Sequence, residues 1–190
     1  MERWVLLRKG ADFEAIGKKY QISPRLACLI RNRDVIGEEA VDRYLNGTIS
    51  DLYDGMLMKD MDKAIDILKE KILEDKKIRV IGDYDIDGVN ATYILLEGLE
   101  RLGADVDSDI PDRISDGYGL NRHLVERAYE AGVDTLITCD NGIAAADEIA
   151  YGKEMGMTVI VTDHHEVPFD EQDGEKRYRI PPADAVMDPK

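Results

Sequence analysis

The sequence predicts an α/β fold, with a parallel sheet flanked by helices and a small N-terminal helical region in front of it. Three observations support this prediction. Up to residue 76 the apolar residues recur at helical spacing. Beyond it, short β-branched runs alternate with helical stretches, and several runs are followed directly by aspartate. Strands that alternate with helices of about 10–15 residues form βαβ units, which build parallel sheets.

The first region, residues 1–76, predicts helices and carries no visible chemistry. Ser23 followed by Pro24 is a helix start, Gly47 follows a helical stretch, and Ile65, Leu68 and Ile72 form one apolar stripe. The expected helices cover residues 13–20, 24–32, 38–45 and 59–75. We expect this region to act as a helical cap.

The second region, residues 77–190, predicts alternating strands and helices. The expected strands are 78–81, 106–110, 135–138, 158–161 and 183–187, and the expected helices are 89–102, 122–131 and 144–155. Residues 169–178 contain six charged residues and a glycine, which predicts a solvated loop. The expected domains are therefore 1–76 and 77–190.

The composition is that of a globular, acidic protein. There are 25 Lys and Arg against 40 Asp and Glu, a net charge of −15, which argues against a broad nucleic-acid-binding surface. A nucleic-acid substrate is still compatible, because bound divalent cations reverse the sign of a local acidic site. No run approaches the roughly 20 apolar residues of a membrane helix, so we expect no membrane association and a cytoplasmic protein.

Acidic residues and histidines follow three of the predicted strands. The first strand leads into Asp83, Asp85 and Asp87, the third into Asp140, and the fourth into Asp163, His164 and His165. In open parallel sheets the ligand crevice lies beyond the carboxyl ends of the strands, so these segments should converge. Carboxylate and imidazole ligands suit Mn²⁺, Mg²⁺, Co²⁺ or Fe²⁺, and two ions about 4 Å apart would serve phosphoester hydrolysis.

Single motifs leave alternatives open. The Asp83-x-Asp85-x-Asp87-Gly88 run opens like a calcium EF-hand loop, but the twelfth position, which needs a glutamate, is Ile94. The Asp85-x-Asp87-Gly88 run also fits haloacid-dehalogenase-type phosphatases, in which the first aspartate attacks phosphorus. Arg113, beside a glycine-containing turn, is either a phosphate contact or an ordinary exposed arginine.

Four motifs in order carry a family resemblance. They are Gly-Asp-Tyr-Asp-Ile-Asp-Gly at 82–88, Pro-Asp-Arg with Asp-Gly-Tyr-Gly-Leu at 111–120, Cys-Asp-Asn-Gly-Ile at 139–143, and Val-Thr-Asp-His-His at 161–165. Residues 76–190 thereby resemble the DHH phosphoesterase superfamily, and within it most resemble the RecJ branch of single-strand-specific exonucleases. The resemblance implies two divalent ions, Mn²⁺ or Mg²⁺, as cofactors.

The resemblance also implies roles for individual residues. It implies that Asp83, Asp85, Asp87, Asp140 and His164 bind metal, with Asp140 as the bridging carboxylate. His165 would stabilise charge beside the scissile phosphate, Asp163 would orient the histidines, and Arg113 would contact phosphate. Which of Asp83, Asp85 and Asp87 are direct ligands is left open.

The implied activity is 5′→3′ hydrolysis of single-stranded DNA to 5′-mononucleotides, in DNA repair and recombination. An alternative is a DHH phosphodiesterase that acts on short RNA or cyclic dinucleotides, and a non-enzymatic alternative only binds metal and a partner. Because members of this branch continue further, we expect a DHH domain that is incomplete at its C-terminus. A helicase or a single-strand-binding protein is the partner expected for the full-length protein.

Overall fold

A computed structural model describes residues 4–5, 9–172 and 174–190 of the chain. The chain forms two compact units, residues 1–54 and 55–190, and each is described by itself. Among the described residues, no helix combines the length and the apolar character that crossing a membrane requires.

The first unit is helical. Its elements are α1 (Phe13–Tyr20), α2 (Pro24–Asn32), α3 (Glu38–Asn46) and the short 3₁₀ helix η1 (Ile49–Asp51). The Ser23 hydroxyl accepts a hydrogen bond from the Leu26 amide, and Pro24 occupies the first turn, so α2 begins where the sequence predicts. Ala27 and Ile30 are buried on the inner face of α2.

The second unit is a parallel α/β sheet. Its helices are η2 (Gly55–Leu57), α4 (Met61–Leu73), α5 (Ile86–Arg101), α6 (Arg122–Glu130) and α7 (Ala146–Glu154). The sheet contains β1 (Ile78–Ile81), β2 (Val106–Asp109), β3 (Thr135–Cys139), β4 (Thr158–Thr162) and β7 (Ala185–Met187). The strand order is β2-β1-β3-β4-β7, and every pairing is parallel. The predicted α/β fold is confirmed.

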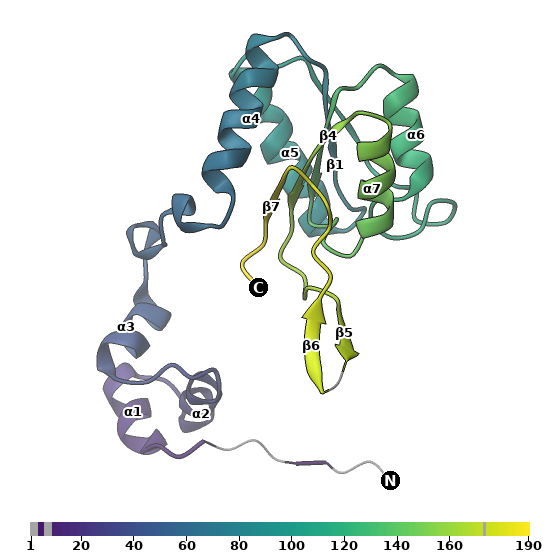
Figure 1. Cartoon of the computed structure of the whole chain (residues 1–190). Coiled ribbons are helices and arrows are strands. Elements are labelled where there is room, and N and C mark those ends of the chain that lie inside the picture. The colour runs from purple at the N-terminus through teal and green to yellow at the C-terminus, as the bar shows by residue number, and fades with distance from the viewer. Residues whose placement is uncertain (1–3, 6–8, 173) are drawn as a thin grey trace. The chain divides into compact units, whose positions relative to one another are not determined.

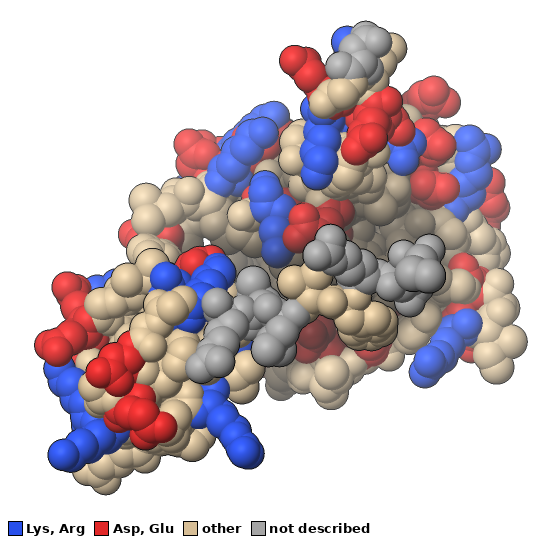
Figure 2. All heavy atoms as spheres, turned by 90° about the horizontal axis from the view of Figure 1, so that it is seen from below, with Lys and Arg blue, Asp and Glu red and all other residues tan. Residues whose placement is uncertain are grey.

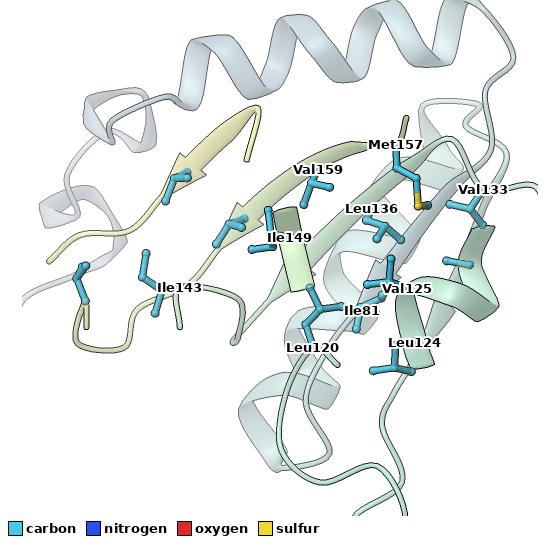
Figure 3. Packing of buried hydrophobic residues seen from close by; sticks show 14 residues of the cluster. Ile81, Leu120, Leu124, Val125, Val133, Leu136, Ile143, Ile149, Met157 and Val159 are labelled. Atoms are coloured by element: carbon cyan, nitrogen blue, oxygen red, sulfur yellow. The ribbon is translucent and has the colours of Figure 1, made fainter. Parts of the chain in front are cut away.

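Alternating side chains of the strands divide the core into two layers. Ile137 and Ile160 pack towards α4 and α5, whereas Leu136 and Val159 pack towards α6 and α7. Figure 1 shows these helix pairs on opposite sides of the sheet, and Figure 3 shows the α6 and α7 layer around Ile149. Because both faces are covered, β3 is buried along its whole length.

The α4 helix belongs structurally with the sheet. It packs against β7, and the Asp60 carboxylate just before it accepts a hydrogen bond from the Val186 amide at 3.1 Å. The structural division therefore falls between residues 54 and 55, whereas the sequence pattern changes at residue 76. A functional division into 1–76 and 77–190 stays a prediction.

Two local predictions need correction. The stretch 169–178 is a two-stranded antiparallel hairpin, β5 (Phe169–Gln172) with β6 (Glu175–Tyr178), instead of a loop. All of its described strand residues are exposed, and the hairpin projects away from the sheet (Figure 1). The α5 helix begins at Ile86, three residues before the predicted start, because Asp85 caps it.

Candidate metal centre

The strand order places a crevice between β1 and β3. From β1 the chain moves outward to β2 on one side, and it later returns to β3 on the other side of β1. The loops that leave β1 and β3 therefore diverge, and in doubly wound sheets ligands bind at this reversal, beyond the carboxyl ends of the strands.

The loop after β1 buries Asp83 and exposes Asp85. Both carboxylate oxygens of Asp83 are buried and have no hydrogen-bond partner among the described residues. Two glycines allow this packing. A Cβ at Gly88 would lie 2.5 Å from the Asp83 backbone, and one at Gly82 would lie 1.9 Å from the Thr92 hydroxyl. The Asp85 carboxylate accepts hydrogen bonds from the amides of Asp87 and Gly88 and begins α5.

The loop after β3 directs Asp140 towards the histidines. Asp140 has φ of 61°, a left-handed conformation that aspartate and asparagine tolerate better than most residues. Its Oδ1 lies 2.7 Å from Nε2 of His164, while its buried Oδ2 has no partner among the described residues. The Asn141 amide donates to the carbonyls of Ile81 and Cys139, which ties the ends of β1 and β3 together.

Asp163 organises the segment after β4. Its Oδ1 accepts from the backbone amides of His164 and His165 and lies 2.7 Å from Nδ1 of His165. Its Oδ2 accepts from the Ile143 amide at 2.9 Å. One carboxylate therefore fixes the two histidines and joins the β4 segment to the loop after β3.

These residues come together in one cluster. Ligand atoms of Asp140, His164 and His165 lie within 4.8 Å of one another. Burial raises the pKa of Asp140, and the Asp85 carboxylate raises it further. The Gly88 amide lowers the pKa of Asp85, and the hydrogen bond that the His165 ring donates to Asp163 raises the pKa of His165.

Two predicted residues lie at the margin of the cluster. Asp87 is exposed in the first turn of α5, where it lines a cavity of about 570 Å³ together with Asp140 and His164. The guanidinium of Arg113 lies 5.3 Å from the centre of the Tyr84 ring, and Arg113 is exposed. The roles of both residues stay predictions.

Two further residues lie at the candidate site without having been predicted as site residues from the sequence. The Tyr118 hydroxyl lies 3.2 Å from Nε2 of His165. Asp188 follows β7, its Oδ2 is buried without a partner among the described residues, and burial raises its pKa. An aspartate directly after an apolar strand is the pattern of Asp140, so the signal for Asp188 was present in the sequence. Tyr118 lies in the Asp-Gly-Tyr-Gly-Leu motif, which carried part of the family resemblance, but the motif alone assigned no role to the tyrosine.

The arrangement fits a bound cation. Four carboxylate oxygens, two on Asp83 and one each on Asp140 and Asp188, are buried without a partner among the described residues. Buried carboxylates without a partner are costly, and a cation removes the cost. Acidic and basic side chains intermix on the face shown in Figure 2, and the described residues form no broad basic surface there.

The chain is similar to known proteins along most of its length. The model of the DHH family, N-terminal domain, matches residues 77–189. The single-stranded-DNA-specific exonuclease RecJ of Bacillus subtilis is 39% identical over 165 residues, covering 86% of this chain and 21% of that protein. RecJ of Escherichia coli is 30% identical over 190 residues, covering 100% of this chain and 31% of that protein.

A solved structure supports the same relationship. The crystal structure of exonuclease RecJ bound to manganese matches with a TM-score of 0.62 at 37% identity, covering 73% of this chain and 33% of that one. The chain thus spans between about a fifth and a third of the length of these relatives. The matches favour the predicted resemblance over a haloacid-dehalogenase-type phosphatase. Since the family model covers more than half of its residues, the chain belongs to the DHH family.

Proposed function

We propose that the chain is the metal-binding part of a single-stranded-DNA exonuclease that acts from the 5′ end and releases 5′-mononucleotides. The observation that carries the proposal is that Asp83 and Asp140 bury carboxylate oxygens without a partner among the described residues, with the His164 imidazole 2.7 Å from Asp140. The likeness to proteins named as single-stranded-DNA-specific exonucleases supports the choice of substrate. A role in DNA repair and recombination, in the cytoplasm, belongs to the same proposal.

The residues would divide the work by position. Asp83, Asp85, Asp140 and His164 would hold divalent ions, Mn²⁺ or Mg²⁺. Such ions activate water for attack on phosphorus and neutralise charge on the leaving oxygen. His165, held by Asp163, would donate a hydrogen bond to the phosphate as negative charge develops. The raised pKa of His165 extends the pH range over which it carries the proton it needs.

Arg113 and protein partners would act away from the metal ligands. The exposed guanidinium of Arg113 would contact a substrate phosphate, for which arginine offers two parallel donors. A helicase or a single-strand-binding protein would supply unpaired strands. The strongly acidic composition of this chain supports the view that most strand binding is done elsewhere in the protein.

Metal binding is tested first, by calorimetry with Mn²⁺ on this chain. We expect Asp140→Asn to abolish binding or weaken it at least about tenfold, because ligating carboxylates dominate such sites. His165→Ala should bind normally, and Asp147→Asn, which alters an exposed aspartate in the first turn of α7, is the matched control. If Asp140→Asn binds Mn²⁺ as tightly as the wild type does, the assignment of Asp140 as a metal ligand is wrong.

Substrate choice is tested with the natural protein that contains this chain. Labelled single-stranded DNA, duplex DNA, single-stranded RNA and a cyclic dinucleotide are compared in the presence of Mn²⁺. We expect 5′-mononucleotides from single-stranded DNA alone, starting at the 5′ end. Preferred cleavage of RNA or of the cyclic dinucleotide would replace the proposal with the alternative DHH phosphodiesterase.

A further inference from the structure

The loop between β2 and α6 holds Tyr118 in a defined place beside the metal centre. Gly117 and Gly119, on either side of it, have φ of 80° and 70°. A Cβ at Gly119 would lie 3.4 Å from Cβ of Asn141, so the loop runs close to the segment after β3. Leu120 is buried in the core next to it, which anchors the loop.

Tyr118 and Asp163 contact opposite nitrogens of the His165 ring. Oδ1 of Asp163 lies 2.7 Å from Nδ1, and the Tyr118 hydroxyl lies 3.2 Å from Nε2. The Tyr118 and His165 rings meet edge to face, with an interplanar angle of 88°. An imidazole with one partner can still turn about that contact, whereas partners at both nitrogens fix its plane.

The Tyr118 hydroxyl keeps its proton at neutral pH and can both donate and accept, although the residue is 55% exposed. Burial and the nearby carboxylates, Asp83 foremost among them, raise the pKa of Tyr118 to about 12. The hydroxyl accepts from Nε2–H of the charged His165, which is the form that donates to the phosphate, and it donates to Nε2 when His165 is neutral. The edge of a second ring, Tyr84, lies against Tyr118 with centroids 6.0 Å apart, which braces the ring.

We propose that Tyr118 is a positioning residue for His165, whose hydroxyl holds the imidazole plane so that Nε2 faces the substrate phosphate. The two side chains line the same cavity of about 300 Å³, beside the metal cluster. In the free protein the Tyr118 hydroxyl would be hydrogen-bonded to Nε2 of His165. When substrate binds, the phosphate would replace the hydroxyl as the partner of Nε2. The inference rests on the proposed function for the identity of the substrate, but the Tyr118–His165 contact itself is testable without substrate.

The first test measures the imidazole directly in this chain. The sequence has three histidines, so a long-range ¹H–¹⁵N spectrum resolves each ring. At a pH where His165 is neutral, we expect a single tautomer protonated at Nδ1. Tyr118→Phe should shift the Nε2 resonance of His165 towards that of a free acceptor and leave His123 unchanged. An unaltered His165 resonance in Tyr118→Phe overturns the proposal.

The second test separates positioning from substrate binding in the natural protein. Tyr118→Phe should lower kcat about 10- to 100-fold with KM and Mn²⁺ affinity unchanged, because the ring is kept and only the hydroxyl is lost. Tyr93→Phe, at an exposed position of α5, is the matched control and should behave as wild type. A raised KM with normal kcat would make Tyr118 a binding residue instead. An inactive wild-type protein would count against the proposed function and leave the spectroscopic result standing.

Discussion

Asp163 shows how one buried carboxylate sets the geometry of the metal centre. Its side chain is 1% exposed, and it accepts hydrogen bonds from three backbone amides and from the His165 ring. Hydrogen bonds to a charged acceptor contribute more than neutral ones, and a buried donor left without a partner is costly. The position of the histidine pair therefore depends on the charge of Asp163 as well as on its shape.

Replacing that charge by an amide should be costly. In Asp163→Asn one acceptor oxygen becomes a donor that faces a backbone or ring N–H. We expect a loss of about 2–3 kcal/mol in the free energy of unfolding, measured by urea denaturation. Asp112→Asn is the control, because Asp112 accepts from Ile114 and Ser115 in an exposed turn and should lose less than about 1 kcal/mol. Equal losses in the two variants would contradict this account.

At the scale of elements, α5 begins unusually close to β1. Gly88 lies in the first turn of α5, where a Cβ would lie 2.5 Å from the Asp83 backbone. A side chain at this position would push the helix start away from the strand. The glycine thus fixes the distance between the buried carboxylate of Asp83 and the cap residue Asp85.

Two alanine substitutions in α5 should have opposite effects. Gly88→Ala should destabilise the protein by about 1–3 kcal/mol and weaken Mn²⁺ binding, because the new Cβ overlaps backbone. Gly98→Ala, at an exposed position with nothing within 4 Å, should stabilise it by about 0.5–1 kcal/mol. Thermal unfolding and calorimetry with Mn²⁺ measure both effects, and a stable, metal-binding Gly88→Ala would refute the packing argument.

The β1–β2 pair at the sheet edge depends on charge. The Arg79 guanidinium donates to both oxygens of Asp107, at 2.6 and 2.7 Å, and lowers the pKa of Asp107. A lowered carboxyl pKa means that the stabilisation is complete above the ordinary value of 3.8 and is lost as pH falls through the folded-state pKa.

This pair predicts a pH-dependent mutant effect. Asp107→Asn should lose about 1 kcal/mol at neutral pH, a modest value because the Asp107 side chain is 36% exposed. The difference from wild type should shrink as the pH is lowered below 3.8. Urea denaturation across that pH range measures it. If the difference in the free energy of unfolding between Asp107→Asn and wild type does not change with pH, the loss of stability comes from packing and not from the ion pair.

At the scale of the whole molecule, the boundary of the sheet unit can be tested by truncation. Residues 55–190 keep α4, whose Ala64 is buried with Ile160, Ala185 and Met187. This fragment should unfold cooperatively and bind Mn²⁺ as the complete chain does. Residues 77–190 lack α4, leave that layer uncovered, and should aggregate or bind ANS. Equal stability of the two fragments would place the boundary at residue 76 after all.

The sequence alone determined the fold class and predicted which residues gather in the candidate site. Strands that alternate with helices require parallel pairing, so the aspartates and histidines after β1, β3 and β4 had to meet at one edge. The hairpin at 169–178 was predicted as a loop because its exposed charged residues show no alternation of apolar and polar residues. The start of α5 was missed because Asp85 acts as a cap, a role that its neighbours in the sequence do not distinguish from a ligand.

Tertiary structure alone decided the finer geometry. Periodicity reports which face of an element is buried and carries no information on which distant element covers it, so the packing of α4 on β7 was not predictable. The contact of Tyr118 with His165 joins two loops that are 47 residues apart. That Asp83 has no partner within the described part of the chain depends on how closely α5 approaches β1. Contacts of this kind arise only when the whole sheet has formed, because long-range packing fixes loop positions that local sequence leaves free.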